Sequence, residues 1–306
     1  MGTKNLTKYY LAAITAFAIW GFFSLVLKPL HQYPSLDILF YRVFLCAILM
    51  LLLTFTVKRS VLHDNIQIFK TLSAKARKRI ILLNTVSGLL LTGNWFFFIY
   101  VMNHISVKAA SLAYLVCPVI TILIAYVLLK EKLTKQQWGA IALSTGGCLL
   151  LSFNHIIDLV FSLVVGASYA LYLVIQRKNT GFDKFLVLTF HIVFSAILLL
   201  PFYPFFSGSL PTSTKFYTYV SIIAIMFTIV PLFLNLFALK GLTSSTTGML
   251  LNTNPIIGFM LAITVYNEKI DLIQILAYTV IFFSVIIFNI RFSKKEAPQV
   301  AEVGCN

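Results

Sequence analysis

The chain has 306 residues, of which 59% are hydrophobic and 11% are charged, and its mean hydropathy is +0.92. Soluble domains carry about 25% charged residues, so this composition excludes an ordinary soluble protein and indicates an integral membrane protein. The formal net charge of +15 first suggests nucleic acid, but the positions of the basic residues, described below, argue against it.

Ten apolar runs are each long enough to cross the bilayer core, which takes roughly 20 residues of helix. They cover residues 9–28, 36–57, 80–103, 108–129, 136–153, 158–176, 184–206, 216–239, 245–266 and 272–291. The first run lacks a small-residue cleavage site, so we expect it to be retained as a span. All ten are continuously apolar rather than alternating, which favours helices over a β-barrel. We predict an all-α integral membrane protein with ten transmembrane helices.

The basic residues are distributed unequally between the connections. If the N-terminus is cytoplasmic, nineteen Lys and Arg lie at the cytoplasmic ends, and four lie at the opposite ends: Lys28, Lys108, Lys215 and Lys269. This bias predicts a multi-pass protein of the cell (inner) membrane with both termini in the cytoplasm. Topology and contact with anionic membrane lipids account for the charge, so we expect no nucleic-acid partner. The longest loop, 58–79, is either a short helix on the inner leaflet or a solvated linker.

The chain contains an internal repeat. PVITILIAYVLLKEKLTKQQW, from Pro118, aligns without gaps to PIIGFMLAITVYNEKIDLIQI, from Pro255, at an offset of 137 residues. The first spans of each half align at an offset of 149, which places Trp20 against Tyr169. We therefore predict two five-helix repeats, 1–153 and 154–291, followed by a cytoplasmic tail, 292–306. Because five is odd, the second repeat crosses the membrane with opposite polarity, an arrangement used by secondary transporters.

Short motifs in the first half support a family resemblance. They are Trp20-Gly21, Tyr41-Arg42, Asn94-Trp95, Ser111-Leu112-Ala113-Tyr114 and Glu131-Lys132-Leu133. With the paired repeats, the chain resembles the drug/metabolite transporter superfamily with EamA-type domains over residues 9–291, and the RarD branch most closely in its first half. The resemblance implies a secondary transporter that exports a small organic solute (amino acid, metabolite or drug-like compound) by alternating access. Import on the same fold remains an alternative.

Two ionisable side chains lie inside predicted spans. Arg42 lies about six residues into the second span, where a charge costs about 2.5–3.5 kcal/mol. It is expected to face a cavity and hold a carboxylate or other anion with its planar fork. Snorkelling to the outer interface, or a bond to a helix end, is the alternative. The 149-residue offset places Arg42 against His191, which is the candidate for proton coupling, or else a neutral histidine bonded to a neighbouring helix.

Polar and aromatic residues complete the predicted midplane site. Prolines are expected to interrupt helices and to serve as hinges: Pro118, Pro231 and Pro255. Polar groups beside broken helices build such sites, although they also serve as interhelical hydrogen bonds, and aromatic side chains stack on apolar or cationic groups. The predicted substrate-binding residues are Arg42, Tyr41, Trp20, Asn94, Trp95, Tyr114, Asn252, Asn254 and His191.

Other functional classes lack their sequence signatures. No HExxH, GxSxG or Walker A motif is present, so we predict no catalytic residues, metal or cofactor and no ATP-driven pumping by this chain alone. No filter sequence suggests a channel. An intramembrane enzyme or a passive scaffold is the rival from another class. The expected partners are a small-molecule substrate, membrane lipids and, as a coupling ion, protons, and the chain is expected to be a monomer or homodimer.

Overall fold

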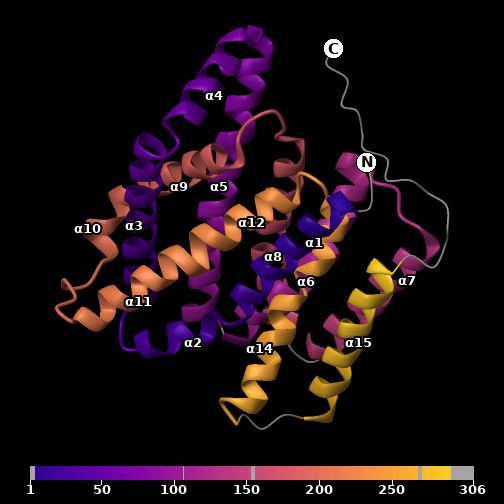
Figure 1. Ribbon diagram of the computed structural model, residues 1–306. Helices are drawn as coiled ribbons and strands as arrows, with labels where there is room; N and C mark the ends of the chain where they lie inside the picture. The colour runs from indigo at the N-terminus through magenta and orange to yellow at the C-terminus, as the bar shows by residue number, and fades with distance from the viewer. Residues whose placement is uncertain (1–3, 106, 153–155, 268–270, 291–306) are drawn as a thin grey trace.

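The computed structural model describes residues 4–105, 107–152, 156–267 and 271–290, where every regular element is helical (Figure 1). Lys269 and the predicted tail, 292–306, lie outside the described residues. The first half contains α1 (Lys4–Gly21), α2 (Phe23–Leu27), η1 (Lys28–Leu30), α3 (Ser35–Thr56), α4 (Arg59–Thr71), α5 (Ala74–His104), α6 (Val107–Leu129) and α7 (Lys135–Ser152). The second contains α8 (Ile156–Lys178), α9 (Lys184–Leu199), η2 (Leu200–Phe202), α10 (Tyr203–Phe206), α11 (Thr214–Ala224), η3 (Ile225–Ile229), α12 (Val230–Ala238), α13 (Ser244–Leu250), α14 (Thr253–Thr264) and α15 (Leu272–Asn289).

Nine helical segments of the described chain are long and apolar enough to cross a membrane. They correspond to nine of the ten predicted spans. The tenth, 136–153, forms α7, whose first turn is the polar sequence Lys135-Gln136-Gln137 and which does not reach the same apolarity. It packs along α15, and Gln136 donates to the backbone oxygens of Ile287 and Ile290. The crossing by α7 therefore remains a prediction.

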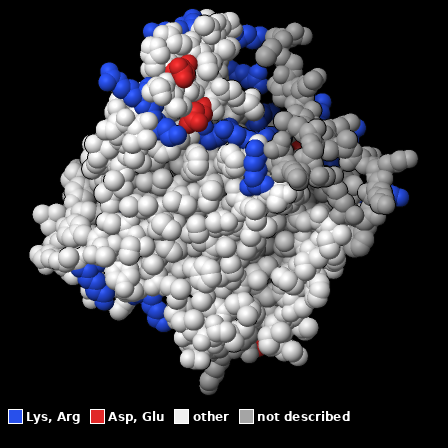
Figure 2. Space-filling model, viewed as in Figure 1, with Lys and Arg blue, Asp and Glu red and all other residues white. Residues whose placement is uncertain are grey.

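Charged side chains gather at one end of the bundle. In Figure 2, Lys and Arg cluster at the end that carries α4, and a broad uncharged surface follows below it. Large apolar side chains such as Leu52, Phe55, Ile197 and Phe205 are exposed on the surface, as a lipid-facing surface requires. We refer to the two ends as the α4 end and the α2 end (Figure 1).

The predicted long loop, 58–79, is helical over most of its length. α4 covers Arg59–Thr71, and α5 begins at Ala74, after Ser73 accepts a hydrogen bond from the backbone of Ala76 and so caps the new helix. In Figure 1, α4 stands at the extreme end of the molecule and does not lie across the bundle. The segment is therefore a helix of the fold, not a solvated linker.

Each of the main contacts between helices of the two halves has an equivalent contact, in which every helix is replaced by its counterpart in the other half. α3 packs on α9, α6 on α13 and α7 on α15, which pairs each helix with its own counterpart in the sequence repeat. α1 packs on α12, and the counterpart pair, α8 and α5, is also in contact. The same holds for α6 with α8 and α14 with α1. The packing therefore has the approximate two-fold symmetry that an inverted repeat produces.

A backbone detail marks the same repeat. Two described non-glycine residues have positive φ angles, Lys130 at 54° and Asn267 at 50°. They are one repeat offset of 137 residues apart. Lys130 directly follows the end of α6, and Asn267 lies three residues after the end of α14. Both halves thus place a left-handed residue at the same repeat position after the corresponding helix.

The predicted proline interruptions differ from one another. Pro118 lies inside α6, which continues unbroken from Val107 to Leu129, so the prediction of an interrupted helix is wrong there. A proline removes one helical hydrogen bond, a loss that neighbouring helices can compensate. Pro231 follows the π-helical turn η3, and Pro255 follows a true break between α13 and α14 at Leu251–Asn252. Only the second half has interrupted helices at these positions.

Candidate functional site

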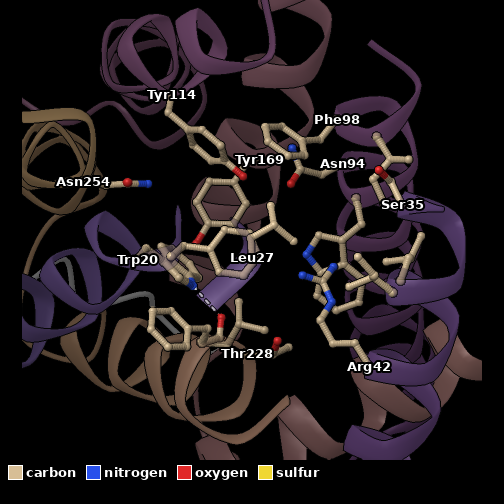
Figure 3. A pocket seen from close by; sticks show the side chains of 17 residues that line it. Trp20, Leu27, Ser35, Arg42, Asn94, Phe98, Tyr114, Tyr169, Thr228 and Asn254 are labelled. Atoms are coloured by element: carbon tan, nitrogen blue, oxygen red, sulfur yellow. Dashed lines mark hydrogen bonds between the residues drawn. The ribbon is translucent and has the colours of Figure 1, made fainter. Parts of the chain in front are cut away.

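A cavity of about 140 Å³ lies between the two halves of the molecule (Figure 3). Its walls come from α1, α2, α3, α5 and α6 of the first half and from α8, η3, α12 and α14 of the second. Leu27 and Ser35, which flank the connection between α2 and α3, place it nearer the α2 end. The lining residues are Trp20, Phe23, Leu27, Ser35, Ile38, Leu39, Arg42, Asn94, Trp95, Phe98, Ile99, Tyr114, Tyr169, Phe227, Thr228, Leu232 and Asn254.

Two residues equivalent by the 149-residue offset meet at this cavity. The rings of Trp20 and Tyr169 pack edge to face with centroids 5.8 Å apart. The indole Nε1 of Trp20 donates to the backbone oxygen of Phe227 at 2.8 Å, and the hydroxyl of Tyr169 accepts from Asn235 at 2.8 Å. Each aromatic side chain therefore bonds to the α11–η3–α12 segment, which fixes the ring at the cavity wall.

Arg42 enters the cavity from α3. Its guanidinium lies over the ring of Trp95, with the central carbon 5.1 Å from the ring centroid, a cation–π contact. Its Nε atom is buried and has no hydrogen-bond partner among the described residues. None of the lining residues is Asp or Glu. The structure therefore holds Arg42 in the cavity on an aromatic ring, without a counter-ion in the cavity wall.

Asn94 and Asn254 lie on different sides of the cavity (Figure 3). The side chain of Asn94 is 2% exposed, and its Nδ2 donates to the backbone oxygen of Val165 at 3.0 Å and to Ser168 at 3.1 Å. It thus joins α5 of the first half to α8 of the second. Asn254 comes from the first turn of α14, just after the helix break. Both polar groups lie where the halves meet.

Three predicted site residues lie away from the cavity. Tyr41 forms a hydroxyl–hydroxyl hydrogen bond with Tyr203 at 3.0 Å and packs against Phe216. Asn252 is fully buried in the core beside Met249. His191 is fully buried and is bonded to Asn84. The structure thus gathers Trp20, Arg42, Asn94, Trp95, Tyr114 and Asn254 around one cavity and places the other three elsewhere.

His191 belongs to a buried polar cluster near the α4 end, which we call the α4-end polar cluster: Asn84, Ser87, Gln176, Asn179, Lys184 and His191. Asn84 accepts from Asn179 at 2.8 Å and lies 3.2 Å from Nε2 of His191. Gln176 donates to Ser87 at 2.6 Å, and Lys184 donates to the backbone oxygen of Asn179. The cluster closes the space between α5, α8 and α9.

Glu131 makes a contact that the sequence reading did not foresee. Its two carboxylate oxygens accept from the backbone N–H groups of Ser244 and Ser245 at 2.8 and 2.9 Å, at the first turn of α13. A carboxylate is favourable there because the N–H groups of a helix start are unpaired and carry partial positive charge. Glu131 therefore joins the end of α6 in the first half to the start of α13 in the second.

Other cavity residues were also missed. Phe98, Thr228 and Phe227 line the cavity, yet as common apolar or small polar side chains in spans they carry no distinguishing sequence signal. Tyr169 carried one, since the 149-residue offset pairs it with Trp20. Among the described residues, no group of three His, Cys, Asp or Glu side chains is placed to hold a metal ion.

Comparison with known proteins identifies relatives along the whole chain. The sequence profile of the EamA-like transporter family matches residues 7–153 and again residues 156–290. An uncharacterized transporter of Pseudomonas aeruginosa is 27% identical over 94% of this chain and 95% of its own. The protein RarD of Escherichia coli is 26% identical over 94% of this chain and 96% of its own. One solved crystal structure superimposes with a TM-score of 0.71 at 15% identity, covering 92% of this chain and 97% of that one, which shows a shared fold.

Proposed function

Because the chain belongs to the EamA-like transporter family, we propose that it is a secondary transporter that exports a small organic solute by alternating access. The solute is proposed to bind in the cavity between the halves, with Trp20, Arg42, Asn94, Trp95, Tyr114 and Asn254 as the binding residues. The protein would lie in the cell (inner) membrane with the α4 end in the cytoplasm, because the basic residues gather at that end (Figure 2).

One observation carries this proposal. The two repeats are equivalent in sequence and packing, but the α2 end of the bundle has a cavity where the α4 end has a buried polar cluster. Arg42 lines a cavity nearer the α2 end, whereas its counterpart by the 149-residue offset, His191, is buried in the α4-end polar cluster. In an inverted repeat each half can adopt the conformation of the other half. The same helix packing therefore allows a second conformation, in which the α4 end is open and the α2 end is closed. A solute bound between the halves would then reach either face in turn.

Counterflow in proteoliposomes tests the proposal. Vesicles loaded with one unlabelled amino acid or metabolite are diluted into the same labelled compound, and the panel is repeated with and without a pH gradient. A carrier accumulates label transiently above equilibrium, whereas a channel only equilibrates it and an enzyme converts it. Absence of counterflow across a broad panel would refute the proposal. Net efflux against net uptake in oriented vesicles separates export from import.

A further inference from the structure

We infer that the cavity selects an organic acid: its carboxylate binds the guanidinium of Arg42, and its apolar, preferably aromatic, body lies against the opposite wall. This inference rests on the proposed function, because it names the class of solute that the transport site takes. It concerns binding, however, and is tested without any transport measurement.

The wall of the cavity carries one positive charge and no negative charge. Arg42 is the one cationic side chain among the lining residues, and none of them is acidic. A buried hydrogen-bonding group without a partner costs about 1–3 kcal/mol, and more when it is charged, and Nε of Arg42 lacks a partner among the described residues. An anion in the cavity supplies the missing negative charge. A cationic solute would face uncompensated repulsion from Arg42.

The orientation of the guanidinium favours a carboxylate. The ring of Trp95 covers the guanidinium at 5.1 Å, which holds its plane, and Figure 3 shows the guanidinium directed to the middle of the cavity. A guanidinium fixed in this way presents parallel N–H groups that match the two oxygens of a carboxylate. Trp95 therefore acts as a positioning residue for the anion site.

The wall opposite Arg42 determines which chemical group can follow the carboxylate of the solute. Opposite Arg42 in Figure 3 lie Trp20, Tyr114 and Tyr169. The Trp20 indole N–H is already used by Phe227, so Trp20 offers only its ring surface to a ligand. The Tyr169 hydroxyl accepts from Asn235 and keeps its own O–H as a donor, and Tyr114 likewise presents a ring with a hydroxyl group. Ring faces bind flat apolar groups. No lining carboxylate is present for an ammonium group, so an acid is favoured over the corresponding amino acid.

Intrinsic tryptophan fluorescence gives a direct binding test. The chain has three tryptophans. Trp20 and Trp95 line the cavity and Trp138 lies in α7, so a Trp138→Phe background reports on the cavity alone. The purified protein is titrated with 3-phenylpropanoate, its neutral amide, the matching amine and L-phenylalanine. We expect the acid to bind about ten- to hundredfold more tightly than the amide, the range given by one charged hydrogen-bonded contact.

Two arginine variants test whether Arg42 causes the preference for the acid over the amide. Arg42→Gln is expected to remove the preference for the acid and to change amide binding less than about threefold. Arg177→Gln is the matched control, because Arg177 is a partly buried arginine that donates to the backbone oxygen of Leu239 and does not line the cavity. It is expected to keep the preference, and thermal melting in detergent verifies that both variants fold.

Four results would overturn the inference. The first is a wild-type protein that binds the amide, the amine or L-phenylalanine at least as tightly as the acid. The second is a protein that binds none of the four compounds, and the third is equal weakening of acid and amide by Arg42→Gln. The fourth is loss of the preference in folded Arg177→Gln. Counterflow of a neutral or cationic solute without acid binding would leave the transporter proposal standing and reject this inference alone.

Discussion

Trp20 donates its indole N–H to the backbone oxygen of Phe227 at 2.8 Å, and the residue four positions after Phe227 is Pro231. A proline has no N–H, so it cannot pair with that carbonyl as an ordinary helical residue would. In a membrane an unpaired carbonyl costs several kcal/mol. Phe227 lies in the π-helical turn η3, where the N–H of Val230 pairs five residues back with Ile225, and Pro231 supplies no N–H to this turn. A side chain of the first half therefore donates to a carbonyl of the second half that Pro231 cannot pair, at the wall of the cavity.

This relationship predicts coupling between the two positions. Trp20→Phe should lower the free energy of unfolding by about 1–3 kcal/mol, because the carbonyl of Phe227 loses its donor. In a Pro231→Ala background the restored backbone N–H can pair with that carbonyl, so the same change should cost at least about 0.5 kcal/mol less. Unfolding in mixed detergent–SDS micelles measures the double-mutant cycle. Additive effects of the two substitutions would contradict the compensation.

The packing of α7 on α15 predicts opposite outcomes for adjacent glycines. A Cβ atom on Gly147 would lie 2.6 Å from Cγ1 of Ile281 and 3.1 Å from the backbone oxygen of Ala277, whereas one on Gly146 meets nothing within 4 Å. Gly147→Ala should destabilise the protein by about 1–3 kcal/mol through overpacking. Gly146→Ala should be neutral or stabilising by up to about 1 kcal/mol. Equal melting temperatures for the two variants would show that α7 does not pack as described.

The Glu131 contact predicts a stability effect at a residue outside the cavity. Glu131→Gln keeps the shape of the side chain but removes its charge and one acceptor, so the start of α13 should lose about 1–2 kcal/mol. Lys132→Ala, an exposed neighbour in the same turn, is the control and should change stability by less than about 0.5 kcal/mol. Solute binding in the cavity should survive in Glu131→Gln. The contact would lose its assigned role if both variants melted like the wild type.

The position of His191 predicts a structural role. It lies within hydrogen-bonding distance of Asn84, at 3.2 Å, and of Tyr172, at 3.5 Å, and does not line the cavity. His191→Gln should therefore reduce stability by about 0.6–2 kcal/mol, the range of a hydrogen bond between membrane helices. Its counterflow should respond to a pH gradient as the wild type does. A folded variant that loses this response would assign proton coupling to His191.

The sequence predicted much of the fold because membrane helices depend on one strong signal, the length of an apolar run. It also predicted two inverted repeats, and the helix contacts of the structure repeat when each helix is replaced by its counterpart in the other half. It predicted an interruption near Pro255, which the structure shows just before α14, but it did not predict the π-helical turn η3 or the continuous helix at Pro118. Pro118 and Pro255 occupy equivalent positions, yet α6 continues and the second-half helix is broken.

The candidate site was predicted only in part, for geometric reasons. Tyr41 and Arg42 are consecutive in α3, and consecutive helical residues point about 100° apart, so only one of them reaches the cavity. Asn252 and Asn254 are likewise separated by a wide angle at the start of α14. His191 is the counterpart of Arg42, but one conformation cannot open both ends of an inverted repeat. Equivalence in sequence therefore does not give equivalent exposure.

The central claim is that the cavity open to Arg42 and the sealed α4-end polar cluster exchange their states during transport. A protein in which alanine replaces Cys46, Cys117, Cys148 and Cys305 allows single cysteines to be placed at Ser87, fully buried in the cluster, or at Leu27, on the cavity wall. Each is treated with a membrane-impermeant maleimide during counterflow of a solute that the wild type carries. We predict that Ser87→Cys becomes reactive from the α4 face only during counterflow, while Leu27→Cys becomes less reactive from the opposite face. Full-rate counterflow with Ser87→Cys permanently unreactive would contradict the account.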